Sequence, residues 1–174
     1  MTDLSKLITL VDEATLAREI DALAERLAPH LEGEWTVVSI LIGATPFTTD
    51  LMKALARRDV HPVLDALWLE SYGDGQESSG RVAVRADLSR SVKGRGVLIV
   101  DDVFDTGRTL HFARTQMEAK GATKVMTCAL ARKPSAPQDG CDFYAIETPD
   151  RFLVGYGMDV AGKFRGLPFI GALD

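Results

Sequence analysis

Residues 97–109 contain the side chains best suited to chemistry in this chain of 174 residues. An apolar run, Val-Leu-Ile-Val, is followed by three carboxylates, those of Asp101, Asp102 and Asp105. The turn that leads into the next helical pattern consists of Thr106, Gly107, Arg108 and Thr109. A helix N-terminus at the carboxyl end of a strand offers backbone N–H groups to a phosphate. Because the carboxylates would repel that phosphate, we expect them to bind sugar hydroxyls, a proton or Mg²⁺, and the segment predicts a phosphorylated-sugar site.

The residue types alone leave three other interpretations of this acidic segment open. Paired aspartates after an apolar strand also begin the Mg²⁺-binding receiver domains of two-component signalling, but there the strand opens the domain, and here residues 1–96 precede it. Asp-Asp-x-x-Asp also occurs on the helices that bind Mg-diphosphate in prenyl synthases, which the glycine at 107 disfavours. An acidic loop could simply cap the next helix through Asp105 or Thr106. Capping explains one carboxylate and leaves the other two without a role.

The composition indicates a single globular domain with a real core. Hydrophobic residues make up 46% of the chain and charged residues 26%, which is ordinary for a globular protein. The net charge of −5 argues against nucleic acid as a partner, because binding to a phosphate backbone requires a basic face. Neither a membrane-spanning stretch nor a signal peptide is recognisable. The two cysteines form no disulfide or metal pattern, so we expect a cytoplasmic protein with reduced thiols.

The spacing of apolar residues predicts alternating strands and helices. Helices are expected over residues 13–28, 47–55 and 109–120. Strands are expected over residues 35–42, 62–69, 82–88, from 97 to the carboxylates, and over 124–131, 142–147 and 152–156, followed by a short irregular tail. The polar, glycine-rich segment 71–80 is expected to be a loop. This alternation is typical of an α/β fold with a mostly parallel, twisted sheet flanked by helices on both faces.

The sequence Val-Asp-Asp-Val-Phe-Asp-Thr-Gly-Arg-Thr at residues 100–109 resembles the phosphoribosyl pyrophosphate (PRPP) motif of type I phosphoribosyltransferases. In that family the two leading acids bind the ribose hydroxyls, and the turn after them holds the 5′-phosphate. The resemblance therefore assigns ribose binding to Asp101 and Asp102. It assigns the 5′-phosphate to the turn made of Asp105, Thr106, Gly107, Arg108 and Thr109. It also implies one domain over residues 1–174, with a small hood built from the N-terminal segment and about residues 140–174.

Three more segments are similar to the hypoxanthine-guanine branch of this family: residues 131–134, 149–159 and 163–171. The resemblance implies that purine is bound by Lys133, Phe152, Leu153 and Asp159. It assigns the pyrophosphate to Ile42, Gly43 and Arg165, and Mg²⁺ to Asp101 and Asp159. Lys133 would donate to the purine O6, and Phe152 would stack on the ring. Ser71 and Tyr72 begin a segment similar to the family's active-site lid.

The reaction implied by the resemblance joins hypoxanthine or guanine to PRPP with Mg²⁺, giving IMP or GMP and pyrophosphate. Asp105 would be the general base, and family members are commonly homodimers or homotetramers. The chain departs from the family at residues 41–43, Leu-Ile-Gly, where the usual sequence is Leu-Lys-Gly. A xanthine-preferring or pyrimidine-linked transferase is an alternative. A non-catalytic regulator that senses PRPP is another. The missing lysine at Ile42 keeps this alternative open, whereas Lys133, Phe152 and Asp159 argue against it, because a sensor needs no complete base pocket.

Overall fold

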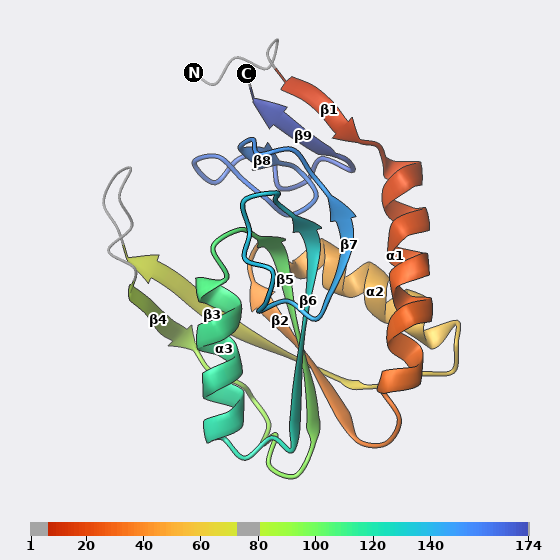
Figure 1. Ribbon diagram of the computed structural model, residues 1–174, viewed down its shortest axis with the longest axis vertical. Coiled ribbons are helices and arrows are strands. Elements are labelled where there is room, and N and C mark those ends of the chain that lie inside the picture. The colour runs from red at the N-terminus through yellow and green to blue at the C-terminus, as the bar shows by residue number, and fades with distance from the viewer. Residues whose placement is uncertain (1–6, 73–80, 174) are drawn as a thin grey trace.

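The computed structural model describes residues 7–72 and 81–173 of the chain. Its main sheet has six strands among these residues, in the order β4-β3-β2-β5-β6-β7 (Figure 1). The strands are β2 (Trp35–Leu41), β3 (Val63–Tyr72), β4 (Arg81–Ala86), β5 (Gly96–Phe104), β6 (Lys124–Arg132) and β7 (Phe143–Glu147). All neighbouring strands are parallel except β3 and β4, which pair antiparallel. The predicted mostly parallel α/β sheet is confirmed.

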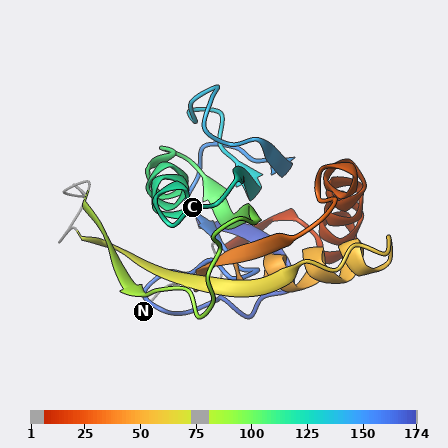
Figure 2. The same cartoon turned by 90° about the horizontal axis from the view of Figure 1, so that it is seen from below.

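The helices of the described residues are α1 (Glu13–Leu27), α2 (Thr45–Ala56) and α3 (Arg108–Ala119). A short 3₁₀ turn, Ala28–His30, follows α1 directly. Asp12 caps α1 by accepting a 2.8 Å hydrogen bond from the backbone N–H of Thr15. Figure 2 shows α1 and α2 close to one another and α3 apart from both. These positions agree with the helices expected from the sequence, within a few residues at each end.

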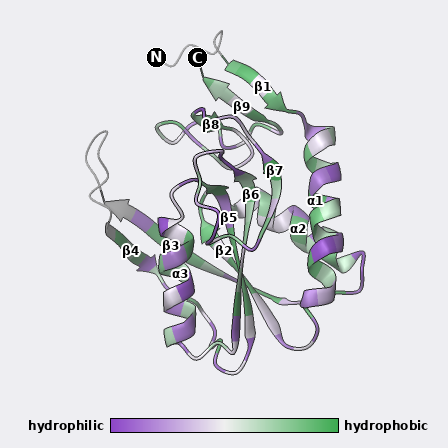
Figure 3. Ribbon diagram, in the orientation of Figure 1, coloured by the Kyte–Doolittle hydropathy of each residue, from purple (hydrophilic) through white to green (hydrophobic). Residues whose placement is uncertain are grey.

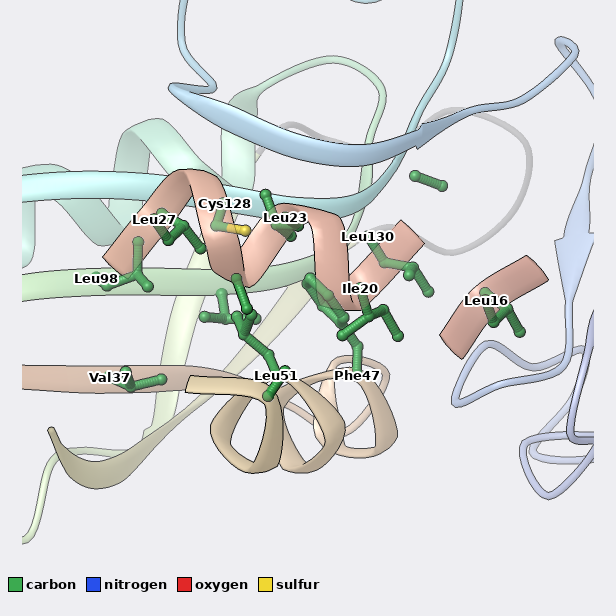
Figure 4. Close-up of a cluster of buried hydrophobic side chains, with 14 of the residues drawn as sticks. Leu16, Ile20, Leu23, Leu27, Val37, Phe47, Leu51, Leu98, Cys128 and Leu130 are labelled. Atoms are coloured by element: carbon green, nitrogen blue, oxygen red, sulfur yellow. The ribbon is translucent and has the colours of Figure 1, made fainter. Parts of the chain in front are cut away.

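Each face of the main sheet has its own apolar core, because alternate residues of a strand point to opposite faces. On one face, α1 and α2 pack against Val37, Leu98 and Cys128 (Figure 4). On the other face, Leu110 and Met117 of α3 belong to a second cluster. This cluster includes the strand residues that alternate with those of the first cluster. Figure 3 shows hydrophobic and hydrophilic residues alternating along α1, as expected for an amphipathic helix.

A second sheet with the order β1-β9-β8 lies beyond the carboxyl ends of β5, β6 and β7 (Figure 1). Its strands are β1 (Leu7–Val11), β8 (Leu153–Val154) and β9 (Ile170–Leu173), and both pairings are antiparallel. The sequence predicted neither β1 nor β9 and expected an irregular tail, so that expectation is wrong. Strands of four or five residues whose partners lie at the other end of the chain give little local periodicity. The strand predicted over 152–156 forms only at Leu153–Val154.

Two other strand boundaries differ from the prediction. β5 continues through Asp101 and Asp102 to Phe104, so these two acids are strand residues and do not lie in a loop. β3 continues through Ser71 and Tyr72, which pair with β4, so these residues do not begin the expected loop. Residues 73–80, the rest of the predicted lid, lie outside the described residues. Within residues 7–72 and 81–173, no helix is long and apolar enough to cross a membrane.

Candidate active site

The turn between β5 and α3 surrounds a cavity of about 100 Å³. Asp101 and residues 103–110 line the cavity, so the first turn of α3 faces it. Gly107 is the N-cap residue and has a φ of +77°, a left-handed conformation that favours glycine. Neither Asp105 nor Thr106 therefore caps the helix, and the capping interpretation of the acidic segment is wrong. The N-terminal N–H groups and the positive dipole end of α3 make the cavity suitable for an anion.

Asp101 and Asp102 form an acidic pair at the end of β5. Burial raises the pKa of Asp101 well above its usual value, and the neighbouring charge of Asp102 raises it further. Burial also raises the pKa of Asp102, although the nearby charge of Arg165 partly opposes this shift. Two adjacent carboxylates, one buried and one partly buried, disfavour simultaneous ionisation unless hydroxyl donors or a cation approach them. The pair therefore suits a ligand rich in hydroxyl groups.

The turn between β2 and α2 lies directly against this acidic pair. A Cβ atom added at Gly43 would lie 1.8 Å from Oδ2 of Asp102, so the close approach requires glycine. The next residue back, Ile42, is 48% exposed, and the Leu41–Ile42 peptide bond is cis. The hydroxyl of Thr45 donates to the Ile42 carbonyl at 2.8 Å, which fixes the turn where α2 begins. The structure thus brings the predicted pyrophosphate turn together with the predicted ribose acids.

The segment after β8 covers the turn from the other side. A Cβ atom at Gly157 would lie 1.9 Å from the Gly43 carbonyl oxygen, so the two backbones are in contact. Arg165 donates to the Gly157 carbonyl at 2.6 Å and pairs with Asp159, with 2.5 Å between Nη2 and Oδ1. Asp159 also accepts a 2.6 Å hydrogen bond from the backbone N–H of Gly162. Arg165 and Asp159 are therefore linked to each other and lie close to the pyrophosphate turn.

The described residues contain no cluster of three or more His, Cys, Asp or Glu side chains that could hold a metal ion. Asp101 and Asp159, the predicted ligands, do not belong to such a cluster, and the Asp159 carboxylate is paired with Arg165. Mg²⁺ is commonly held by one or two carboxylates together with substrate phosphates and water. The carboxylates of Asp101 and Asp159 are donors of the kind that such an ion takes together with a phosphorylated ligand.

A third group of side chains lies where β6 ends. The ammonium nitrogen of Lys133 is 3.1 Å from Oδ2 of Asp105 and 3.7 Å from Oδ1 of Asp150. Phe152 is 57% exposed, whereas Leu153 is buried in the second sheet. Of the predicted purine residues, Lys133 thus lies beside the turn after β5, and Phe152 follows Asp150 by two residues. The sequence interpretation gave Asp150 no role, although its place two residues before Phe152 was a usable signal.

Comparison with known proteins agrees with this geometry. Residues 9–161 match the model of the phosphoribosyl transferase domain family. The chain belongs to this family. As the sequence motifs predicted, its relatives place the chain in the hypoxanthine-guanine branch of the family.

Three relatives illustrate the similarity of this chain to known members of the family. The bifunctional protein TilS/HprT of Listeria innocua is 40% identical over 167 residues, which cover 94% of this chain and 25% of that protein. The hypoxanthine-guanine phosphoribosyltransferase of Bacillus subtilis is 34% identical, with 94% of this chain and 91% of the relative covered. A crystal structure of a hypoxanthine phosphoribosyltransferase from Staphylococcus aureus superposes with a TM-score of 0.88 at 30% identity, covering 98% of this chain and 93% of that one. The chain thus spans about a quarter of the Listeria protein and nearly all of the other two.

Proposed function

We propose that this protein is a purine salvage enzyme that transfers the phosphoribosyl group of PRPP to hypoxanthine or guanine. The products are IMP or GMP and pyrophosphate. The observation that carries the proposal is the position of Lys133, within 3.1 Å of Asp105 and beside the anion-suited turn of α3. A donor for a 6-oxo group and an acceptor for a ring proton are thus adjacent to a phosphate site. The activity in the names of the Bacillus and Staphylococcus relatives supports the same reaction.

Each group of side chains has a role in the proposed reaction. The turn Asp105–Thr109 binds the 5′-phosphate, and Asp101 and Asp102 accept hydrogen bonds from the ribose hydroxyls. Gly43, Ile42 and Arg165 hold the pyrophosphate, with the planar guanidinium suited to phosphate oxygens. Phe152 stacks on the purine, and Lys133 donates to its O6. Asp105 accepts the proton from purine N7 while the ring nitrogen replaces pyrophosphate at C1′.

Mg²⁺ is part of the proposal and would be held by Asp101 and Asp159 together with the substrate diphosphate. When bound, the ion neutralises charge that develops on the leaving pyrophosphate. The protein's own contribution is to position the ribose and the diphosphate between the acidic pair and Arg165. A homodimer or homotetramer is also part of the proposal.

The experiment that tests the function is pyrophosphate release from Mg-PRPP with a panel of bases: hypoxanthine, guanine, xanthine, adenine, uracil and orotate. We expect turnover with hypoxanthine or guanine and none with adenine. A site built to hydrogen-bond a substrate group rejects an analogue that lacks the group. Turnover only with xanthine or a pyrimidine would make that base the substrate in place of hypoxanthine and guanine. PRPP binding without turnover of any base would identify a PRPP-sensing regulator instead.

The role of Asp105 is tested by Asp105→Asn, which keeps the size of the side chain. We expect kcat to fall by about 10²–10⁴, the usual contribution of a general base, while PRPP binding is retained. Asp139→Asn is the control, because Asp139 is an exposed residue in the loop after β6. Turnover close to that of the wild type would exclude Asp105 from proton transfer.

A further inference from the structure

Lys133 pairs with two carboxylates and is the least exposed of the three side chains. Its side chain is 16% exposed, whereas the side chains of Asp105 and Asp150 are 45% and 64% exposed. The backbone N–H of Lys133 donates to the Phe104 carbonyl at 3.0 Å, which fixes the start of the side chain beside the turn after β5. The ammonium group thus lies between two carboxylates that come from different segments.

Asp150 belongs to a turn that is itself tied to β6. The backbone N–H of Thr148 donates to the Arg132 carbonyl at 3.0 Å, and that of Arg151 donates to the Pro149 carbonyl at 2.8 Å. Arg132 immediately precedes Lys133, so both carboxylates are anchored close to the same strand end. A change of partner by Lys133 therefore requires movement of its flexible side chain alone.

The contact between Lys133 and Asp105 conflicts with the two roles proposed for these residues. The Lys133 ammonium, 3.1 Å from Oδ2 of Asp105, donates to that oxygen and occupies one of its lone pairs. That oxygen is then a poorer acceptor for a purine proton. Lysine has three donors and no acceptor, so it can keep one carboxylate while it exchanges the other for a carbonyl oxygen.

We propose that Lys133 blocks Asp105 in the free protein and leaves it only when a 6-oxopurine supplies its carbonyl oxygen, with Asp150 as the residue that guides the exchange. The inference rests on the proposed function and explains why base selection and proton transfer would be coupled. A 6-amino group donates hydrogen bonds and cannot accept one from an ammonium. With adenine, Lys133 therefore stays on Asp105. Asp150 is a positioning residue, since it acts through Lys133.

The block is tested with Lys133→Met, which removes the ammonium and keeps a long side chain. We expect kcat/KM for hypoxanthine to fall, because the donor to O6 is lost. We expect kcat/KM for adenine to rise by about tenfold, because Asp105 is free. If Lys133 only contacts O6, hypoxanthine use falls while adenine use stays unchanged, and that result would overturn the inference.

The guiding role is tested with Asp150→Asn against Asp139→Asn, an equal loss of charge on the exposed loop after β6. For Asp150→Asn we expect kcat/KM for hypoxanthine to fall by about 1.5- to 5-fold, the range for a largely exposed ion pair, with KM for PRPP unchanged. Asp150→Glu should restore most of the activity, because it keeps the charge. If the wild type turns over normally and Asp150→Asn has the same kcat/KM for hypoxanthine as Asp139→Asn, the guiding role of Asp150 is overturned and the proposed function is not. Absence of turnover with every 6-oxopurine would overturn the proposed function and this inference together.

Discussion

At the scale of single residues, the buried acid Asp101 links the candidate site to stability. Burial and the Asp102 charge raise its pKa in the folded protein, so the folded state binds its proton more strongly than the unfolded chain does. The resulting contribution to stability is complete below the unfolded pKa of about 3.9 and is lost as the pH rises through the folded pKa. Ionisation of Asp101 at neutral pH therefore lowers the stability of the ligand-free protein.

Asp101→Asn removes this ionisation. We expect the variant to be more stable than the wild type at pH 8 by on the order of 1 kcal/mol, or about 2–4 °C in Tm, with the difference shrinking toward pH 4. Thermal unfolding at several pH values measures this, with Asp139→Asn as the exposed control. An Asp101→Asn protein no more stable than the wild type at pH 8 would contradict the unfavourable ionisation.

Ile42 is the second residue with a testable consequence, because the family usually has lysine there. A lysine would bring a charge-assisted donor to the pyrophosphate, a contact worth about 1.5–3 kcal/mol. We expect Ile42→Lys to tighten pyrophosphate binding and to lower KM for PRPP, while KM for the base changes little. Calorimetry with pyrophosphate and Mg²⁺ compares the two proteins. Equal affinity would show that the backbone N–H groups of the turn are sufficient.

At the scale of elements, the contact between the turn after β2 and the segment after β8 holds the site together. Gly157 has a φ of +100°, and a Cβ there would also meet the Gly43 carbonyl oxygen at 1.9 Å. Gly162 has a φ of +78° but nothing within 4 Å of an added Cβ. Both Gly→Ala changes strain the backbone, and only the one at 157 also separates the two segments.

We therefore expect Gly157→Ala to lower the free energy of unfolding by at least about 2 kcal/mol more than Gly162→Ala. It should also raise KM for PRPP, since the pyrophosphate turn is displaced. Urea unfolding and initial-rate kinetics measure the two effects. Similar losses in both variants would mean that left-handed strain, and not the contact between the segments, explains the requirement for glycine.

At the scale of the whole molecule, the second sheet shares its core with the main sheet. Val11, Leu153 and Ile170 belong to the same buried cluster as α1 and α2. We therefore expect a single cooperative unfolding transition for both sheets. Ile170→Ala should lower the free energy of unfolding by about 2–5 kcal/mol, because Ile170 is fully buried in the central strand β9.

Ile8→Ala is the matched control, since Ile8 lies in the edge strand β1 of the same sheet and is exposed. We expect it to change the free energy of unfolding by less than about 1 kcal/mol. Denaturant unfolding followed by fluorescence and by circular dichroism measures both variants. An early, separate transition seen only in Ile170→Ala would show that the second sheet unfolds independently.

The sequence by itself determined the main sheet, its helices and the turn that follows β5. Buried strands and amphipathic helices have local periods, and the pattern from Val100 to Thr109 is contiguous, so neither needs long-range information. Only the tertiary structure decided that β1 pairs with β9, that Gly43 contacts Asp102 and Gly157, and that Lys133 lies between Asp105 and Asp150. These contacts join residues far apart in the chain, and the packing that brings them together leaves no periodic trace in the sequence.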